Sequence, residues 1–128
     1  MDKSTLVDAD MKAGEALLKK LDEDKFKVRA ALWLYMPDPE EWRLVLALPD
    51  IDADGPKKAY EKVQSELQEL DGRSELSLEN ISLVSPRDKL IKALRTIIKT
   101  GKEISHIRLS KNVINNVFIE DAYIYRLI

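Results

Sequence analysis

The residues whose spacing is most typical of metal chemistry lie between positions 50 and 61. Acidic residues alternate there, glycine follows directly, and a glutamate completes the pattern: Asp50, Asp52, Asp54, Gly55 and Glu61. This spacing fulfils the calcium-loop pattern, in which carboxylates supply oxygens, glycine allows a sharp turn and the last glutamate binds with both oxygens. The sequence therefore presents these four acids as a candidate Ca²⁺ site.

The context of this acidic segment favours a simpler interpretation. A calcium loop of this kind follows a helix, whereas Pro49 closes a predicted strand and no second loop exists to pair with it. Acidic side chains also gather where a helix begins, because free backbone N–H groups and the helix dipole favour negative charge there. We therefore expect the acids to precede a helix that begins at Pro56, with the metal site as the weaker alternative.

Positive charge concentrates in one segment of a chain whose net charge is −2. Residues 1–85 hold 12 Lys and Arg against 19 Asp and Glu, whereas residues 86–111 hold 8 against 2. Four of the basic residues recur at helical spacing and would form a stripe on one helix face: Lys92, Arg95, Lys99 and Lys102. The stripe is a candidate site for nucleic acid or another polyanion. A solvated helix face, or contact with the acidic part of a second copy, is the alternative.

A third candidate surface depends on a predicted β-hairpin over residues 28–49. Two apolar runs flank Pro37 to Glu41, and a five-residue turn there would place Met36 opposite Trp42. Even-numbered residues from Val28 to Leu48 would then share one apolar face, because side chains alternate along a strand. A helix starting after Asp38 is the competing interpretation.

The reverse face of this hairpin would carry aromatic and arginine side chains: Arg29, Trp33, Tyr35 and Arg43. Trp, Tyr and Arg are enriched in tight protein interfaces, so these four residues are a candidate partner-binding surface. The alternative is that a helix covers Trp33 and Tyr35 and leaves the two arginines at the rim.

Catalytic residues find little support in the sequence. There is no cysteine, the single histidine is His106, and neither a nucleophile turn nor a glycine-rich phosphate loop is present. No cofactor is expected. A metal-dependent hydrolase that uses unassigned carboxylates is the remaining enzymatic hypothesis.

The elements that would position these residues follow from apolar spacing and from turn signals. Helices are predicted over 5–21, 56–70 and 85–99, with Ser85 capping the last. Strands are predicted over 28–36, 42–48, 76–85, 104–109, 113–119 and 123–127. The order αββαβαβββ indicates a single α+β domain over residues 1–128, in which about three helices pack on a mixed, mainly antiparallel sheet.

Composition completes the set of expectations. A hydrophobic content of 45% and a charged content of 34% are typical of a soluble globular protein. No apolar run approaches the roughly 20 residues that span a bilayer, so no membrane partner and a cytoplasmic location are expected. The sequence favours a non-enzymatic domain that binds a protein partner or its own copy. Binding of nucleic acid or another polyanion is the second hypothesis.

Overall fold

A five-stranded sheet forms the centre of the molecule in the computed structural model, which describes residues 5–70 and 76–128. The strand order is β3-β2-β1-β5-β4. The strands are β1 (Ala30–Met36), β2 (Glu41–Ala47), β3 (Ile81–Val84), β4 (Ile107–Ile114) and β5 (Val117–Leu127). β3 runs parallel to β2, whereas the β1·β2, β1·β5 and β4·β5 pairs are antiparallel. The predicted α+β class with a mixed sheet is thus confirmed.

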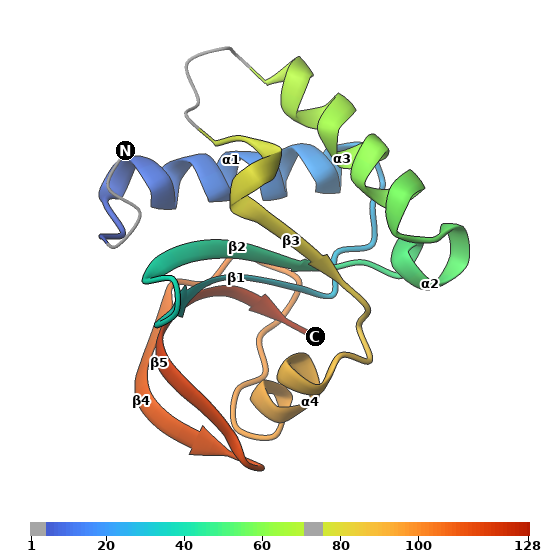
Figure 1. Ribbon diagram of the computed structural model, residues 1–128. Coiled ribbons are helices and arrows are strands. Elements are labelled where there is room, and N and C mark those ends of the chain that lie inside the picture. The colour runs from blue at the N-terminus through green and yellow to red at the C-terminus, as the bar shows by residue number, and fades with distance from the viewer. Residues whose placement is uncertain (1–4, 71–75) are drawn as a thin grey trace.

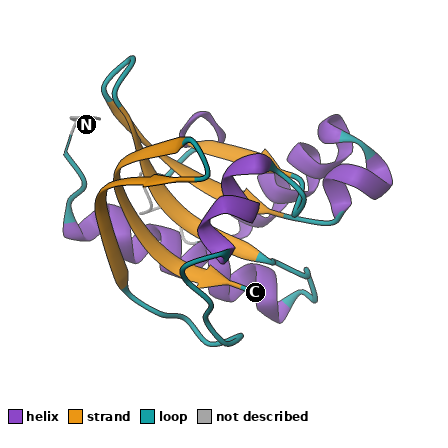
Figure 2. Cartoon of the chain, turned by 90° about the horizontal axis from the view of Figure 1, so that it is seen from below, coloured by secondary structure: helices purple, strands orange, loops and turns teal. Residues whose placement is uncertain are grey.

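Helices cover both faces of this sheet. The helices α1 (Asp8–Glu23) and α3 (Pro56–Glu69) lie on one face, and the short helix α4 (Lys89–Arg95) lies on the other, beside the curved β4–β5 hairpin (Figure 1). A view from below shows α4 against the strands (Figure 2). The short helix α2 (Asp50–Asp54) precedes α3, and a 3₁₀ turn, η1 (Leu78–Asn80), leads into β3. No described helix is long and apolar enough to cross a membrane.

Helix α1 packs on the sheet through one apolar stripe. Leu17, Leu18 and Leu21 recur at helical spacing and are fully buried, as the sequence predicted. Gly14 belongs to the same stripe and lies directly above two aromatic rings of the sheet. There the Trp33 indole N–H donates to the Tyr125 hydroxyl over 3.1 Å, and that hydroxyl donates to the Met11 carbonyl. This buried chain ties β1 and β5 to α1.

The predicted register of the β1–β2 hairpin is wrong by one residue. Its turn has four residues, 37–40, so Tyr35 rather than Met36 pairs with Trp42. As a result Leu32 faces the α4 side of the sheet, whereas Leu44 faces the side covered by α1 and α3. Both faces of the sheet are apolar and covered, so the hydrophobic pattern fits either register equally well.

The C-terminal half also differs from the predicted elements. Three tail strands were expected, but β4 and β5 are two continuous strands joined at Asn115 and Asn116, whose φ angles are +49° and +66°. Asparagine tolerates this left-handed conformation, which two-residue hairpin turns require. Helix α4 begins later than predicted because the Asp88 carboxylate, not Ser85, caps it by accepting from the Leu90 N–H over 2.9 Å. The predicted end of the second long helix, at Asp71 and Gly72, lies outside the described residues.

Candidate functional site

A hollow of about 410 Å³ opens where the end of α1, the start of β1 and the end of β5 meet. Four of its lining side chains are basic and one is acidic: Lys27, Arg29, Lys102, Arg126 and Asp22. We call this feature the basic hollow. Its excess of positive charge is notable because the whole chain is slightly acidic, with a net charge of −2.

Arg126 is the fixed part of the basic hollow. It lies in β5 with 4% exposure, and its two terminal nitrogens meet the two Asp22 oxygens at 2.9 and 2.8 Å. It also donates to the carbonyls of Val28 and Lys102. Such a two-point pair holds the guanidinium plane in one orientation. Asp22 therefore compensates only one of the positive charges, and the Arg126 Nε is buried without a partner in the described part of the chain.

Arg95 extends the positive charge from the end of α4. Its Nε and Nη2 atoms are buried and have no hydrogen-bond partner among residues 5–70 and 76–128. Burial, and then the positive charge of Arg29, lowers the pKa of the Arg95 guanidinium. The Arg95 and Arg29 guanidinium groups thus lie near enough to repel each other, although Arg95 itself does not line the basic hollow.

The predicted basic stripe is only partly formed. Lys92 and Arg95 lie on α4, but the helix ends at Arg95, so Lys99 and Lys102 belong to the segment that follows it. Lys102 reaches the basic hollow, whereas Lys92 lines a separate shallow hollow beside Arg87. Charge clustering in the sequence indicated this region. It could not indicate Lys27 or Arg126, which come from distant segments and meet only through the sheet.

The four residues of the predicted aromatic surface lie in three different environments. Trp33 is 1% exposed and packs in the core on the α1 side, and Tyr35 is half-buried at the same face. The one-residue shift in register puts Arg43 on the opposite face, where its Nε donates to Ser82 Oγ over 2.8 Å. Arg29 lines the basic hollow. These residues do not form one surface, and the predicted protein partner stays a prediction.

The acids between positions 50 and 61 lie in helices rather than in an open loop. Asp50 and Asp54 sit on α2, where the Lys62 ammonium contacts their carboxylates at 3.1 and 2.6 Å. Asp52 accepts a hydrogen bond from Ser85 Oγ over 2.7 Å, and Glu61 is exposed on α3. The Lys62 ammonium already lies between the Asp50 and Asp54 carboxylates. This geometry favours the interpretation that the acids stabilise the start of a helix over the interpretation that they bind Ca²⁺.

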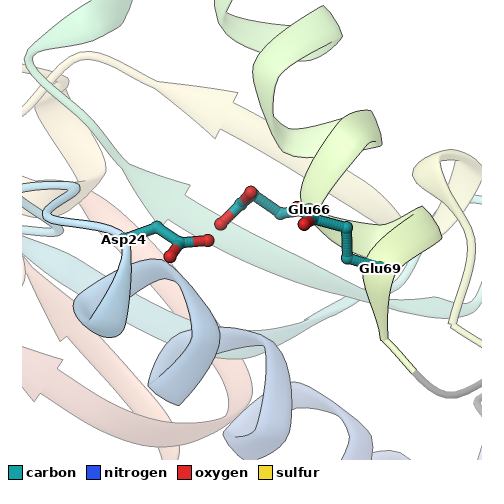
Figure 3. A group of neighbouring side chains, drawn as sticks. All are labelled: Asp24, Glu66 and Glu69. Atoms are coloured by element: carbon teal, nitrogen blue, oxygen red, sulfur yellow. The ribbon is translucent and has the colours of Figure 1, made fainter.

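A second acidic group, which the sequence reasoning missed, lies between the end of α1 and the last turns of α3. We call Asp24, Glu66 and Glu69 the acid cluster; one carboxylate oxygen from each lies within 4.8 Å of the others (Figure 3). Glu66 is 7% exposed, and the Lys20 ammonium lies 2.9 Å from Asp24 and 3.6 Å from Glu69. The available signal was the position of Glu66 on the buried face of α3, three residues after Val63.

Burial, together with the hydrogen bond to Asp24, raises the pKa of Glu66 from 4.5 to about 7. The folded state therefore holds this proton more tightly than the unfolded chain, and its contribution to stability disappears as the pH rises through 7. Between pH 5 and pH 8, with a chelator present, we expect the free energy of unfolding to fall by about 2 kcal/mol less in Glu66→Gln than in the wild type.

Urea unfolding at several pH values measures this change. Glu61→Gln, an exposed glutamate on the same helix, is the matched control and should keep the wild-type slope. The lowered pKa of Asp24 affects stability only below pH 5, so it does not change the direction of the expected effect between pH 5 and pH 8. Equal slopes in the wild type and in Glu66→Gln would contradict the assignment.

Comparison with known proteins adds no further constraint. No protein-family model, no curated protein and no solved structure matches this chain. The single histidine, His106, is exposed and lies 2.8 Å from Glu15 on α1, in a surface pair.

Proposed function

We propose that this domain is a non-catalytic binding module that recognises a phosphate-bearing ligand in the basic hollow. The observation that carries the proposal is the convergence of four basic side chains on one hollow, opposed by a single acidic side chain, with the Arg126 Nε buried there without a partner in the described part of the chain. The proposal keeps the non-enzymatic binding role that the sequence favoured. The ligand, a phosphate-bearing anion, comes from the second hypothesis, in which the domain binds a polyanion.

Phosphate is a good match for the arginine side chains of the basic hollow. Guanidinium groups match phosphate oxygens with two parallel hydrogen bonds, and such charge-assisted bonds are about twice as strong as neutral ones. Arg29 and Arg95 repel each other in the free protein, so an anion bound beside Arg29 also relieves that repulsion. Phe26 and Val28 give the hollow an apolar wall for the rest of the ligand.

The shape of the positive region favours a compact phosphate ligand over a nucleic-acid backbone. A backbone needs basic side chains spaced along an extended path, because affinity grows with each phosphate that is neutralised. The stripe that would provide such a path ends at Arg95, and Lys92 lies at a different hollow. The remaining positive charge lines one open hollow.

Calorimetric titration with pyrophosphate tests the proposal. We expect one saturable site, with at least a tenfold loss of affinity in the double variant Arg29→Gln, Lys102→Gln, which removes two of the basic side chains that line the hollow. The control is Lys57→Gln, Lys58→Gln, which removes the same charge from exposed positions of α3 outside the hollow and should keep affinity within about twofold. Equal losses in the two double variants would show nonspecific attraction and overturn the proposal.

The variant Asp22→Asn should change pyrophosphate affinity in the opposite direction. This carboxylate competes with the ligand for Arg126, so its neutralisation should tighten pyrophosphate binding several-fold. Weaker binding by folded Asp22→Asn would contradict the assigned site. Circular dichroism before each titration shows that the variants are folded.

A further inference from the structure

We propose that the acid cluster, Asp24 with Glu66 and Glu69, is a binding site for a hard divalent cation such as Mn²⁺ or Ca²⁺. Nothing in the basic hollow uses these residues. The proposal is therefore independent of the phosphate proposal and can fail or succeed separately.

The geometry of the three carboxylates suits a shared ion. Glu66 and Glu69 are three residues apart on α3, so they lie on one side of the helix, and Asp24 faces them from the end of α1. Figure 3 shows the Asp24 and Glu66 side chains pointing toward each other. The oxygens of the three groups lie within 4.8 Å of one another. Opposite oxygen ligands of Ca²⁺ are about 5 Å apart, so little movement is needed.

An independent observation points to a missing ligand at this position. The Glu66 side chain is more than nine-tenths buried, with 7% exposure, and its Oε1 has no hydrogen-bond partner within the described residues. A buried carboxylate oxygen without a partner is costly, because it has lost its water without a replacement. A cation among the three carboxylates would take the place of the hydrogen bond between Glu66 and Asp24 and would also satisfy this oxygen.

The local charge also matches a divalent ion. The three carboxylates and the Lys20 ammonium sum to −2 when all are ionised. Lys20 contacts Asp24 and Glu69 but not Glu66, and its side chain is long and flexible. It can move away when an ion enters. At Asp50 and Asp54, by contrast, Lys62 bridges both carboxylates and neither has a buried oxygen without a partner.

A titration of the full chain with Mn²⁺ tests this site. The protein is first treated with a chelator to remove bound metal, and binding is then monitored by water-proton relaxation. We expect one site with a Kd on the order of 10⁻⁴ M. Glu66→Gln and Glu69→Gln should each weaken binding at least tenfold. Lys20→Met should strengthen it, because it removes the competing ammonium. Unfolding does not confound this test, since glutamine keeps the shape of Glu66 and can donate to Asp24.

Glu61→Gln is the discriminating control. Glu61 lies on the same helix and belongs to the calcium pattern in the sequence, so this variant separates the two sites. Unchanged Mn²⁺ affinity in Glu61→Gln with a loss in Glu66→Gln supports the acid cluster. Loss of binding in Glu61→Gln alone, or no saturable binding to the wild type below 5 mM (about fifty times the expected Kd), overturns it.

Discussion

Gly14→Ala is expected to lower the free energy of unfolding by about 2 kcal/mol, although alanine is the better helix former. A Cβ atom at this position would lie 2.6 Å from the Tyr125 hydroxyl oxygen and 2.8 Å from Trp33 Nε1. Both rings are buried and joined by a hydrogen bond, so neither can move without disturbing the sheet. The clash therefore outweighs the roughly 1 kcal/mol that the helix gains from alanine.

Urea unfolding of a small variant set measures this effect. Gly101→Ala is the control, because a Cβ atom on Gly101 meets nothing within 4 Å and stability should change by less than about 0.5 kcal/mol. Tyr125→Phe removes the nearest clashing atom. In that background the cost of Gly14→Ala should fall by about 1 kcal/mol. A stabilising Gly14→Ala would show that α1 does not pack this closely on β1 and β5.

Arg126→Met is expected to destabilise the protein by about 2 kcal/mol. Methionine retains the apolar stem of the side chain, so the loss reports the guanidinium group rather than a cavity. The substitution leaves Asp22 without its two-point partner, and the Val28 and Lys102 carbonyls lose a donor. The Asp22 side chain is 37% exposed and can be solvated again, so the cost reflects mainly the lost charge-assisted hydrogen bonds and the two carbonyls left without this donor.

A double-mutant cycle with Asp22→Asn identifies the origin of this loss. If the pair is responsible, Arg126→Met should cost at least 1 kcal/mol less when Asp22 is already neutral. Thermal unfolding of the four proteins provides the values. Additive effects would mean that Arg126 stabilises the strand without its partner, and the basic hollow would then lack a fixed wall.

Local patterns in the sequence predicted most of the elements. The stripe of Leu17, Leu18 and Leu21 predicted α1, because side-chain periodicity reports burial directly, and Pro56 marked the start of α3. Strand boundaries in the tail were wrong, since Ser110 to Asn112 is polar enough to resemble a turn but lies inside β4. The exposed side of an edge strand tolerates such residues, and only the partner strand determines that they pair.

The charged sites were less accessible to sequence reasoning. A shift of one residue in the register of the hairpin decides which face of the sheet carries Arg43. Because both faces are apolar, the hydrophobic pattern of the sequence does not determine that register. Arg126 and Asp22 are 104 residues apart in the chain and meet only once β5 lies beside β1. In the sequence Glu66 resembles an ordinary surface acid, and its burial depends on the packing of α3 in the folded chain. Sites built across elements therefore need the tertiary structure.

The most direct test of the central claim is to observe the arginine Nε–H signals by ¹⁵N NMR during a pyrophosphate titration. Arg29 and Arg126 line the basic hollow, and the Arg126 Nε lacks a hydrogen-bond partner in the described chain, so a bound phosphate must change their surroundings. We predict saturable shifts of these two signals, with the signal of Arg108, which is held by Asp121, unmoved. Unmoved Arg29 and Arg126 signals at pyrophosphate concentrations that shift the lysine signals would contradict the account.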